Sequence, residues 1–150
     1  MRPATSTRWA CLLGALLVLS GCRELRVQAL QRGTTTVLGS GKELVVVRDT
    51  ATLDRLGIKA PVHFRNEFAV VLLLGPHTQT GYRQIQEHLS PTLDRTHIVL
   101  FEEQPLDGGQ PTRPYRTYTL WIAPNSLYRR GYPVRVVTPS NQPIMETTLP

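Results

Sequence analysis

The chain has 150 residues, of which 41% are hydrophobic and 19% charged, with a formal net charge of +6. These values fit one soluble domain with an appendage and exclude a collagen-like or low-complexity chain. Two cysteines, Cys11 and Cys22, exclude a multi-disulfide scaffold and a four-thiolate metal site. The excess of 17 basic over 11 acidic residues raises the question of an acidic partner.

The N-terminal segment has the layout of a secretory signal peptide. A short positive region precedes residues 9–19, an apolar run too short to span a bilayer, which takes about 20 residues. The run ends in Leu19-Ser20-Gly21-Cys22, which matches the bacterial lipobox, where the cysteine is acylated before cleavage. We therefore expect residues 1–21 to be a lipoprotein signal peptide and Cys22 to carry the lipid. The alternative is an ordinary cleaved signal with a cysteine nearby by chance.

The lipobox also predicts where the mature protein lies. Acyl chains contribute roughly 0.8 kcal/mol per buried methylene, so two or three chains anchor a protein stably. We expect a lipid anchor on the extracytoplasmic face of a bacterial membrane, in the cell envelope. Residues 22–32 are predicted to be the lipidated cysteine and a tether, which can include a first edge strand because apolar residues alternate there. A single β-rich domain is predicted over residues 33–150.

The first elements of this domain are short. Gly33-Thr34-Thr35-Thr36 and Gly39-Ser40-Gly41 predict turns. Residues 42–48 (KELVVVR) are rich in β-branched side chains and predict a strand. Asp49 is suited to cap a helix, and the leucines that follow fall on one face before Gly57, so we expect a helix over residues 50–56.

A central strand is predicted over residues 68–74, an apolar run of strand length that ends at Gly75-Pro76. The run does not alternate with polar residues, which predicts burial on both faces. A loop rich in Gly and Pro is expected over residues 104–114. Further strands are expected over residues 82–89, 96–103, 115–123, 134–138 and 144–149. Short connections favour antiparallel pairing, so we predict a strand-dominated α+β fold: a mostly antiparallel sheet, or a partly open barrel or sandwich, with one short helix.

Residues that could catalyse a reaction or bind a metal form no recognisable constellation. Two imidazoles can reach one metal ion when their histidines are two residues apart on a strand or four apart on a helix. No pair among the four histidines has either spacing; they are His63, His77, His88 and His97. The serines lie in turn sequences that explain them. Glu102 and Glu103 are adjacent on a predicted strand and therefore point to opposite faces, which argues against an acid–base pair. We expect a non-enzymatic protein with no cofactor and no metal site.

The basic surplus is concentrated near the C-terminus. Residues 104–150 have a net charge of +3, and residues 23–150 sum to +4. Tyrosines and Trp121 lie among the arginines, a mixture that can stack on nucleic acid, but a secreted address argues against that partner. Three interpretations of this basic region stay open. It could bind an acidic protein face, it could bind an anionic envelope polymer, or its arginines could simply be solvated around aromatic residues of the core. The arginines concerned are Arg113, Arg116, Arg129, Arg130 and Arg135.

Four short motifs follow one another in a characteristic order. They are an apolar strand ending in Gly (residues 70–75), Gln79-Thr80-Gly81-Tyr82, a strand ending in acidic residues before Pro105 (residues 98–103), and Thr112-Arg113-Pro114-Tyr115. This order resembles the PrcB family, lipoprotein subunits of secreted protease complexes, specifically their C-terminal domain. One departure is Thr80, which stands where the family has the first of two glycines and so argues against a positive φ there.

The resemblance implies an accessory or stabilising subunit for an exported protein, with a protease as the partner, and no known catalysis. The alternative is a cell-envelope module that binds glycan or anionic polymer. We expect the loops over residues 75–81 and 104–114 to form one rim that contacts the partner. A structural interpretation of the same residues as turn and strand signals stays open. The predicted contact residues are Gly81, Tyr82, Thr112, Arg113, Pro114, Tyr115 and Arg116.

Overall fold

The computed structural model describes residues 26–91 and 95–150, so the predicted signal peptide and Cys22 lie outside the described residues. Its elements are β1 (Gln28–Thr35), β2 (Glu43–Val47), α1 (Thr50–Arg55), β3 (Glu67–Gln79), β4 (Arg83–Pro91), β5 (Thr96–Glu103), β6 (Pro111–Pro124), the 3-10 turn η1 (Asn125–Leu127), β7 (Pro133–Val137) and β8 (Pro143–Thr148). The predicted strand-dominated fold with one short helix is confirmed. No helix in the described part of the chain has the length and hydropathy needed to cross a membrane.

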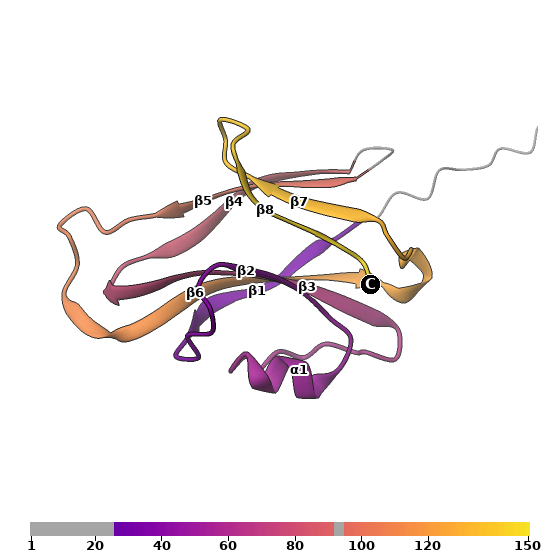
Figure 1. Ribbon diagram of the computed structural model, residues 1–150, viewed down its shortest axis with the longest axis horizontal. Coiled ribbons are helices and arrows are strands. Elements are labelled where there is room, and N and C mark those ends of the chain that lie inside the picture. Colours follow the sequence, from indigo (N-terminus) through magenta and orange to yellow (C-terminus); the bar gives the residue numbers. More distant parts are fainter. Residues whose placement is uncertain (1–25, 92–94) are drawn as a thin grey trace, which may run out of the picture.

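The strands form two four-stranded sheets that face each other (Figure 1). Sheet A has the order β1-β6-β3-β2, and sheet B has the order β4-β5-β7-β8. Every pairing is antiparallel except that of β5 with β7. Between these two strands the chain passes through sheet A as β6, and this long crossover allows the parallel pairing.

The apolar core lies in two layers, one on each face of sheet A. Between the sheets, side chains of β3 and β6 such as Phe68, Leu72 and Trp121 pack against Ile98 and Val136 of sheet B. On the outer face of sheet A, α1 and the segment after it cover a second cluster, and Figure 1 shows α1 on that side. Residues of β3 therefore alternate between two buried faces, which confirms its prediction as the central strand.

Helix α1 forms where the sequence predicts it. The Asp49 side chain accepts a hydrogen bond from the Thr52 N–H at 2.7 Å, which satisfies one of the free donors of the first turn. Leu53 is fully buried against sheet A. Gly57 follows with φ +69, a left-handed conformation that ends the helix.

Two predictions based on Gly and Pro were wrong. Residues 33–35, predicted as a turn, lie within β1, where they pair with β6. Gly33 stands opposite Tyr118, and a Cβ on Gly33 would lie 3.0 Å from the tyrosine hydroxyl, so the glycine serves this close approach within a strand. Strand β3 continues past Gly75-Pro76 to Gln79. A register shift between Leu74 and His77 accommodates the proline, which has no N–H to donate.

Candidate functional site

The two predicted rim segments meet at one end of the sandwich, where β3 turns into β4 and β5 connects to β6 (Figure 1). The Thr80 N–H donates to the Gln110 carbonyl at 2.9 Å, and the Gln110 N–H donates to Thr80 Oγ1 at 3.0 Å. The segments thus form one hydrogen-bonded rim. Residues 75–79 belong to β3 and residues 111–114 belong to β6, so strand ends supply much of what was predicted as loop.

The turn between β3 and β4 depends on Gly81. Its φ is +101, and a Cβ there would lie 2.7 Å from the Cβ of Pro105 in the facing connection. Thr80 is not one of the described residues whose φ is positive. This agrees with the expectation for a threonine at the position where the family pattern has a glycine. Its hydroxyl instead binds the backbone of Gln110, which a glycine could not do.

Tyr82 and Tyr115 stand behind the rim. The Tyr82 ring stacks on the imidazole of His77 with 3.9 Å between centroids, and the Tyr115 ring lies tilted at 5.7 Å from the same imidazole. The Tyr115 hydroxyl donates to the Gln79 carbonyl at 2.8 Å and accepts from the Tyr82 N–H at 3.3 Å. One hydroxyl therefore ties the last residue of β3 to the residue that precedes β4.

A polar network continues from His77 into the space between the sheets. Glu102 Oε1 lies 2.8 Å from His77 Nε2 and accepts a hydrogen bond from Thr117 Oγ1 at 2.5 Å. The Gln84 amide in turn donates to the Thr117 carbonyl at 3.0 Å. Sequence reasoning missed this network because its members come from four strands, and no local spacing relates them. The network orients the Tyr82 ring through its stacking on His77, while His77 and Glu102 also line an open hollow of about 520 Å³.

The adjacent carboxylates behave as predicted. Glu102 points between the sheets, whereas Glu103 pairs with Arg83 on the exposed side. The side-chain hydrogen bond and charge of Arg83 lower the pKa of Glu103, and Glu103 raises the pKa of Arg83 in return. The two glutamates therefore point to different surfaces.

A groove of about 370 Å³ opens at the rim. Its walls come from three places: the end of β1, the β3–β4 turn and the start of β6. Five of the seven predicted contact residues line it, and Pro114 belongs to the same stretch of β6 without lining it. The lining residues are Thr34, Thr36, Thr80, Gly81, Tyr82, Thr112, Arg113 and Tyr115.

Arg116, the last predicted contact residue, was wrongly assigned to the surface. Its side chain is fully buried, with Nε donating to the Val37 carbonyl at 2.8 Å and Nη1 to the Gly41 carbonyl at 2.9 Å. Nη1 also lies 3.3 Å from Glu43 Oε1. Strand alternation explains the error: Thr117 faces sheet B, so Arg116 faces the opposite side, where the turn before β2 covers it.

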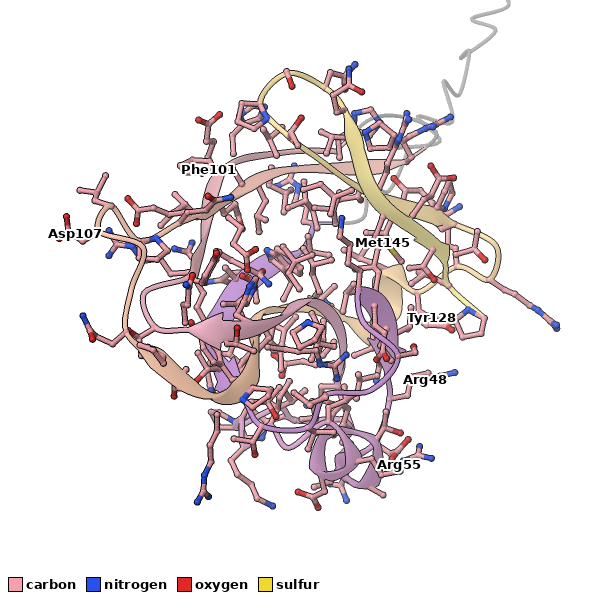
Figure 2. All side chains as sticks on the ribbon, turned by 60° about the vertical axis from the view of Figure 1, so that its left-hand side comes forward. Arg48, Arg55, Phe101, Asp107, Tyr128 and Met145 are labelled. Carbon is pink, nitrogen blue, oxygen red and sulfur yellow. The ribbon has the colours of Figure 1, made fainter. Side chains whose placement is uncertain are left out.

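The C-terminal arginines do not share one face. Arg116 is buried, Arg113 lines the rim groove, and Arg135 in β7 lies 3.5 Å from Glu146 of β8. Elsewhere, Arg48 lies over the ring of Tyr128 at 4.5 Å, and Figure 2 shows these two side chains together, away from Asp107 at the tip of the β5–β6 connection. The predicted basic region is therefore divided among several surfaces.

The aromatic residues among these arginines are mostly structural. Trp121 is fully buried between the sheets, and its Nε1 donates to Gln86 Oε1 at 2.6 Å. The buried Tyr118 receives a hydrogen bond from Gln31 at 2.6 Å, and the Tyr128 hydroxyl donates to the Pro150 carbonyl at 2.6 Å. Of the aromatics after residue 103, Tyr115 alone lines the rim groove.

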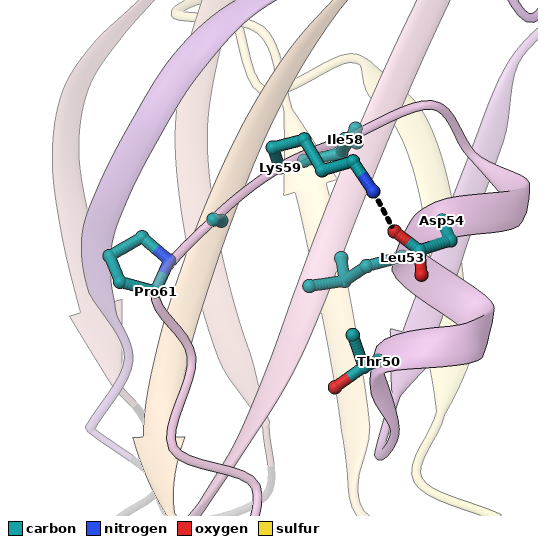
Figure 3. Close-up of a pocket in the computed structure, with 7 residues that line it drawn as sticks. Thr50, Leu53, Asp54, Ile58, Lys59 and Pro61 are labelled. Carbon is teal, nitrogen blue, oxygen red and sulfur yellow. Dashed lines mark hydrogen bonds and ion pairs between the residues drawn. The ribbon is translucent and has the colours of Figure 1, made fainter.

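A second hollow, of about 410 Å³, lies between α1 and the segment after it (Figure 3). Leu53 and Ile58 form its apolar floor, and Lys59 pairs with Asp54 beside it. None of the predicted contact residues lines it. Within residues 26–91 and 95–150, no group of three or more His, Cys, Asp or Glu side chains is placed to hold a metal ion.

Comparisons with protein-family models, with curated proteins and with solved structures found no match to this chain.

Proposed function

We propose that this protein is a non-enzymatic, lipid-anchored accessory subunit that binds and stabilises another exported protein through the rim groove. The order of PrcB-like motifs favours a protease as that partner. The observation that carries the proposal is the convergence of Gly81, Tyr82, Thr112, Arg113 and Tyr115 on one groove, although they come from separate parts of the sequence.

The chemistry of the groove suits a protein surface. Tyrosine and arginine are the side chains enriched at the energetic centres of protein interfaces. Two tyrosines and Arg113 line this groove, together with four threonines. The hydrogen bonds of Thr80 and Tyr115 hold its walls before a partner arrives. A site ordered in advance loses less conformational entropy on binding, which favours affinity.

The predicted anchor keeps the start of β1 near the membrane, whereas the rim groove lies at the other end of that strand, beside Thr34 and Thr36. Val27 is part of the buried core, and it follows the predicted lipidated Cys22 by five positions. Five extended residues reach at most about 18 Å, because the chain spans no more than 3.6 Å per residue. The eight residues of β1 add about 26 Å at 3.3 Å per residue, so the proposed partner is an exported protein that comes within roughly 45 Å of the anchoring lipid.

Site-specific photocrosslinking in intact cells tests this proposal. A photoreactive amino acid replaces Thr112 in the groove, and in a matched control it replaces Arg55, an exposed residue of α1. We expect the probe at position 112 to give one protein adduct, identified by mass spectrometry as an exported protein, and the probe at position 55 to give none. Recovery of cell-wall polymer without protein at position 112 would contradict the proposal and favour the envelope-binding alternative.

A further inference from the structure

Strand β1 ends sheet A with an outer edge that has no neighbouring strand in the described sheets. Its register with β6 is regular over residues 31–35, after a shift between Ala29 and Gln31. Arg32, Gly33 and Thr34 are exposed. Unpaired backbone N–H and C=O groups along such an edge are a template for another strand. Residues 31–35 contain neither a proline nor a lysine that would block it.

The other sheet edges are protected, whereas the register shift of β1, between Ala29 and Gln31, lies outside residues 32–34. Edge strand β4 carries a register shift between Gln86 and His88 and ends at Pro91. Edge strand β8 begins at Pro143, next to a register shift between Val136 and Val137 of β7. The remaining edge strand, β2, lies in contact with β8. Bulges, prolines and coverage are the usual devices that prevent strand addition. The segment after α1 bonds to Gln31 and to the buried Thr35, but residues 32–34 between them are exposed and carry no proline or register shift, which makes them the best-suited edge for pairing.

A channel runs along this edge. A hollow of about 310 Å³ lies between β1 and β4, and it shares Thr34 and Tyr82 with the rim groove. The two hollows together extend from Arg32 to Arg113. A strand laid against β1 would place its inward side chains beside Tyr82 and Ile85. The β1 side of the channel, residues 32–36, is about 13 Å long at 3.3 Å per residue, which accommodates roughly five extended residues.

The charge of the channel specifies what the strand carries. Its lining includes Arg32, Arg83 and Arg113 but no Asp or Glu. Arg83 is paired with Glu103, whereas Arg32 and Arg113 form no ion pair with any residue that the structure describes. Two unpaired guanidinium groups, one toward each end of the channel, complement carboxylates on an incoming segment.

We infer that an extended acidic segment of the partner protein adds as a strand to residues 31–35 of β1, with carboxylates on Arg32 and Arg113. This inference rests on the proposed accessory role and names the chemistry of the contact. Backbone hydrogen bonds supply affinity in this kind of recognition, and the side chains that fill the channel supply specificity. The interaction weakens as salt concentration rises, because the two arginines are exposed and their charges are screened.

The test uses the full-length lipidated protein in detergent and a capped pentapeptide of sequence Glu-Val-Glu-Val-Glu, with the Lys-Val-Lys-Val-Lys peptide as its counterpart. We expect the acidic peptide to bind and to slow hydrogen exchange of the backbone amides of residues 31–35. Arg32→Glu and Arg113→Glu should each weaken binding about tenfold or more, equivalent to about 1.4 kcal/mol. Arg65→Glu, the same charge change at an exposed residue outside the channel, should leave affinity unchanged.

Equal binding of the basic peptide, or protection elsewhere without protection of residues 31–35, would overturn the inference. Thermal unfolding of each variant verifies that the fold is retained, which we expect because both channel arginines are exposed. The crosslink from position 112, which leaves both channel arginines in place, separates this inference from the accessory role. A protein adduct that persists unchanged in Arg32→Glu cells rejects strand addition alone, and the absence of any protein adduct rejects the accessory role itself.

Discussion

Arg113 and Arg116 stand three positions apart in β6, yet their side chains have opposite environments. Arg113 is exposed and lines the rim groove. Arg116 is fully buried and joins the turn before β2 to the middle of sheet A through two backbone carbonyls and Glu43. A buried charge needs partners that replace its hydration, and Nε and Nη1 of Arg116 find them in this turn, whereas Nη2 is buried without a hydrogen-bond partner among the described residues.

Replacement of Arg116 by methionine keeps most of the side-chain volume and removes the guanidinium group that these partners bind. We expect Arg116→Met to lower the free energy of unfolding by about 2–4 kcal/mol, because the carbonyls of Val37 and Gly41 lose their donors. Arg113→Met is the matched control and should change stability by less than about 0.5 kcal/mol. Urea unfolding measures both variants, and equal effects would refute the structural distinction between them.

The same cluster makes stability depend on pH. The Ser40 N–H lowers the pKa of Glu43 from its ordinary value of 4.5, and the Ser40 hydroxyl and Arg116 act in the same direction, against desolvation. A depressed folded-state pKa stabilises the fold above the unfolded-state pKa, and this stabilisation is lost as pH falls through the folded-state pKa. The stability difference between the wild type and Glu43→Gln should therefore be largest near neutral pH and shrink below about pH 4.5. Unfolding curves between pH 3 and pH 7 measure it; a difference that grows on acidification would contradict the assignment.

At the scale of elements, strand ends and turns build the site. Strands β3 and β6 extend well past the apolar runs that predict them, and their ends pair with each other at His77 and Tyr115. This extension carries the β3–β4 turn to the β5–β6 connection, where Gly81 meets Pro105. The close approach leaves no space for a side chain on Gly81, and a Cβ on Gly109 would likewise lie only 2.2 Å from the Thr80 carbonyl oxygen, so the rim depends on both glycines.

Two glycine substitutions test that dependence. Gly81→Ala combines a φ of +101 with a Cβ only 2.7 Å from the Pro105 Cβ, whereas Gly108→Ala has a φ of +72 and open space around its Cβ. We expect Gly81→Ala to cost about 2–3 kcal/mol and Gly108→Ala about 1 kcal/mol, since only the first adds a steric clash to backbone strain. Thermal unfolding gives the ranking. Equal losses would mean that the rim adjusts freely to a side chain at Gly81.

At the scale of the whole molecule, sheet A is covered on both faces, and sheet B completes a sandwich open along β1 and β4. The described residues contain no cysteine, so the described part of this proposed envelope protein is held without disulfides, by its two apolar clusters and by buried polar contacts such as those of Arg116. Arg113, Arg116 and Arg135 lie in separate environments, at the rim groove, in the buried turn before β2 and beside Glu146 of β8, so these three charges do not form one basic face.

The lipid anchor is tested on the same scale. We expect Cys22→Ala to release the exported protein from the membrane fraction, because no acyl chain then contributes its roughly 0.8 kcal/mol per buried methylene. Cys11→Ala is the matched control, since Cys11 is removed with the predicted signal peptide. The Cys11→Ala protein should remain in the membrane fraction. Cell fractionation and immunoblotting measure both variants. Retention of Cys22→Ala in the membrane would refute lipidation as the anchor.

Local sequence determined most of the elements. Strand β5 was predicted with its observed bounds, and β2, α1, β7 and β8 were predicted within two residues at each end. Apolar runs, β-branched residues and the Asp49 cap act over neighbouring positions, so a sequence window contains the information. Gly33, Gly75 and Pro76 misled the same reasoning, because pairing with β6 stabilises extended backbone at residues that favour turns in isolation.

The sequence by itself also indicated the order of motifs around the rim and the absence of a recognisable catalytic pattern. Only the tertiary structure decided that Thr80 and Gln110 join, that His77 meets Glu102, that Arg116 is buried and that β1 leaves a free edge beside a basic channel. These features depend on which strands pair and which faces are covered. Such contacts join residues far apart in the chain, and their energies come from burial and pairing that no local pattern of residues records.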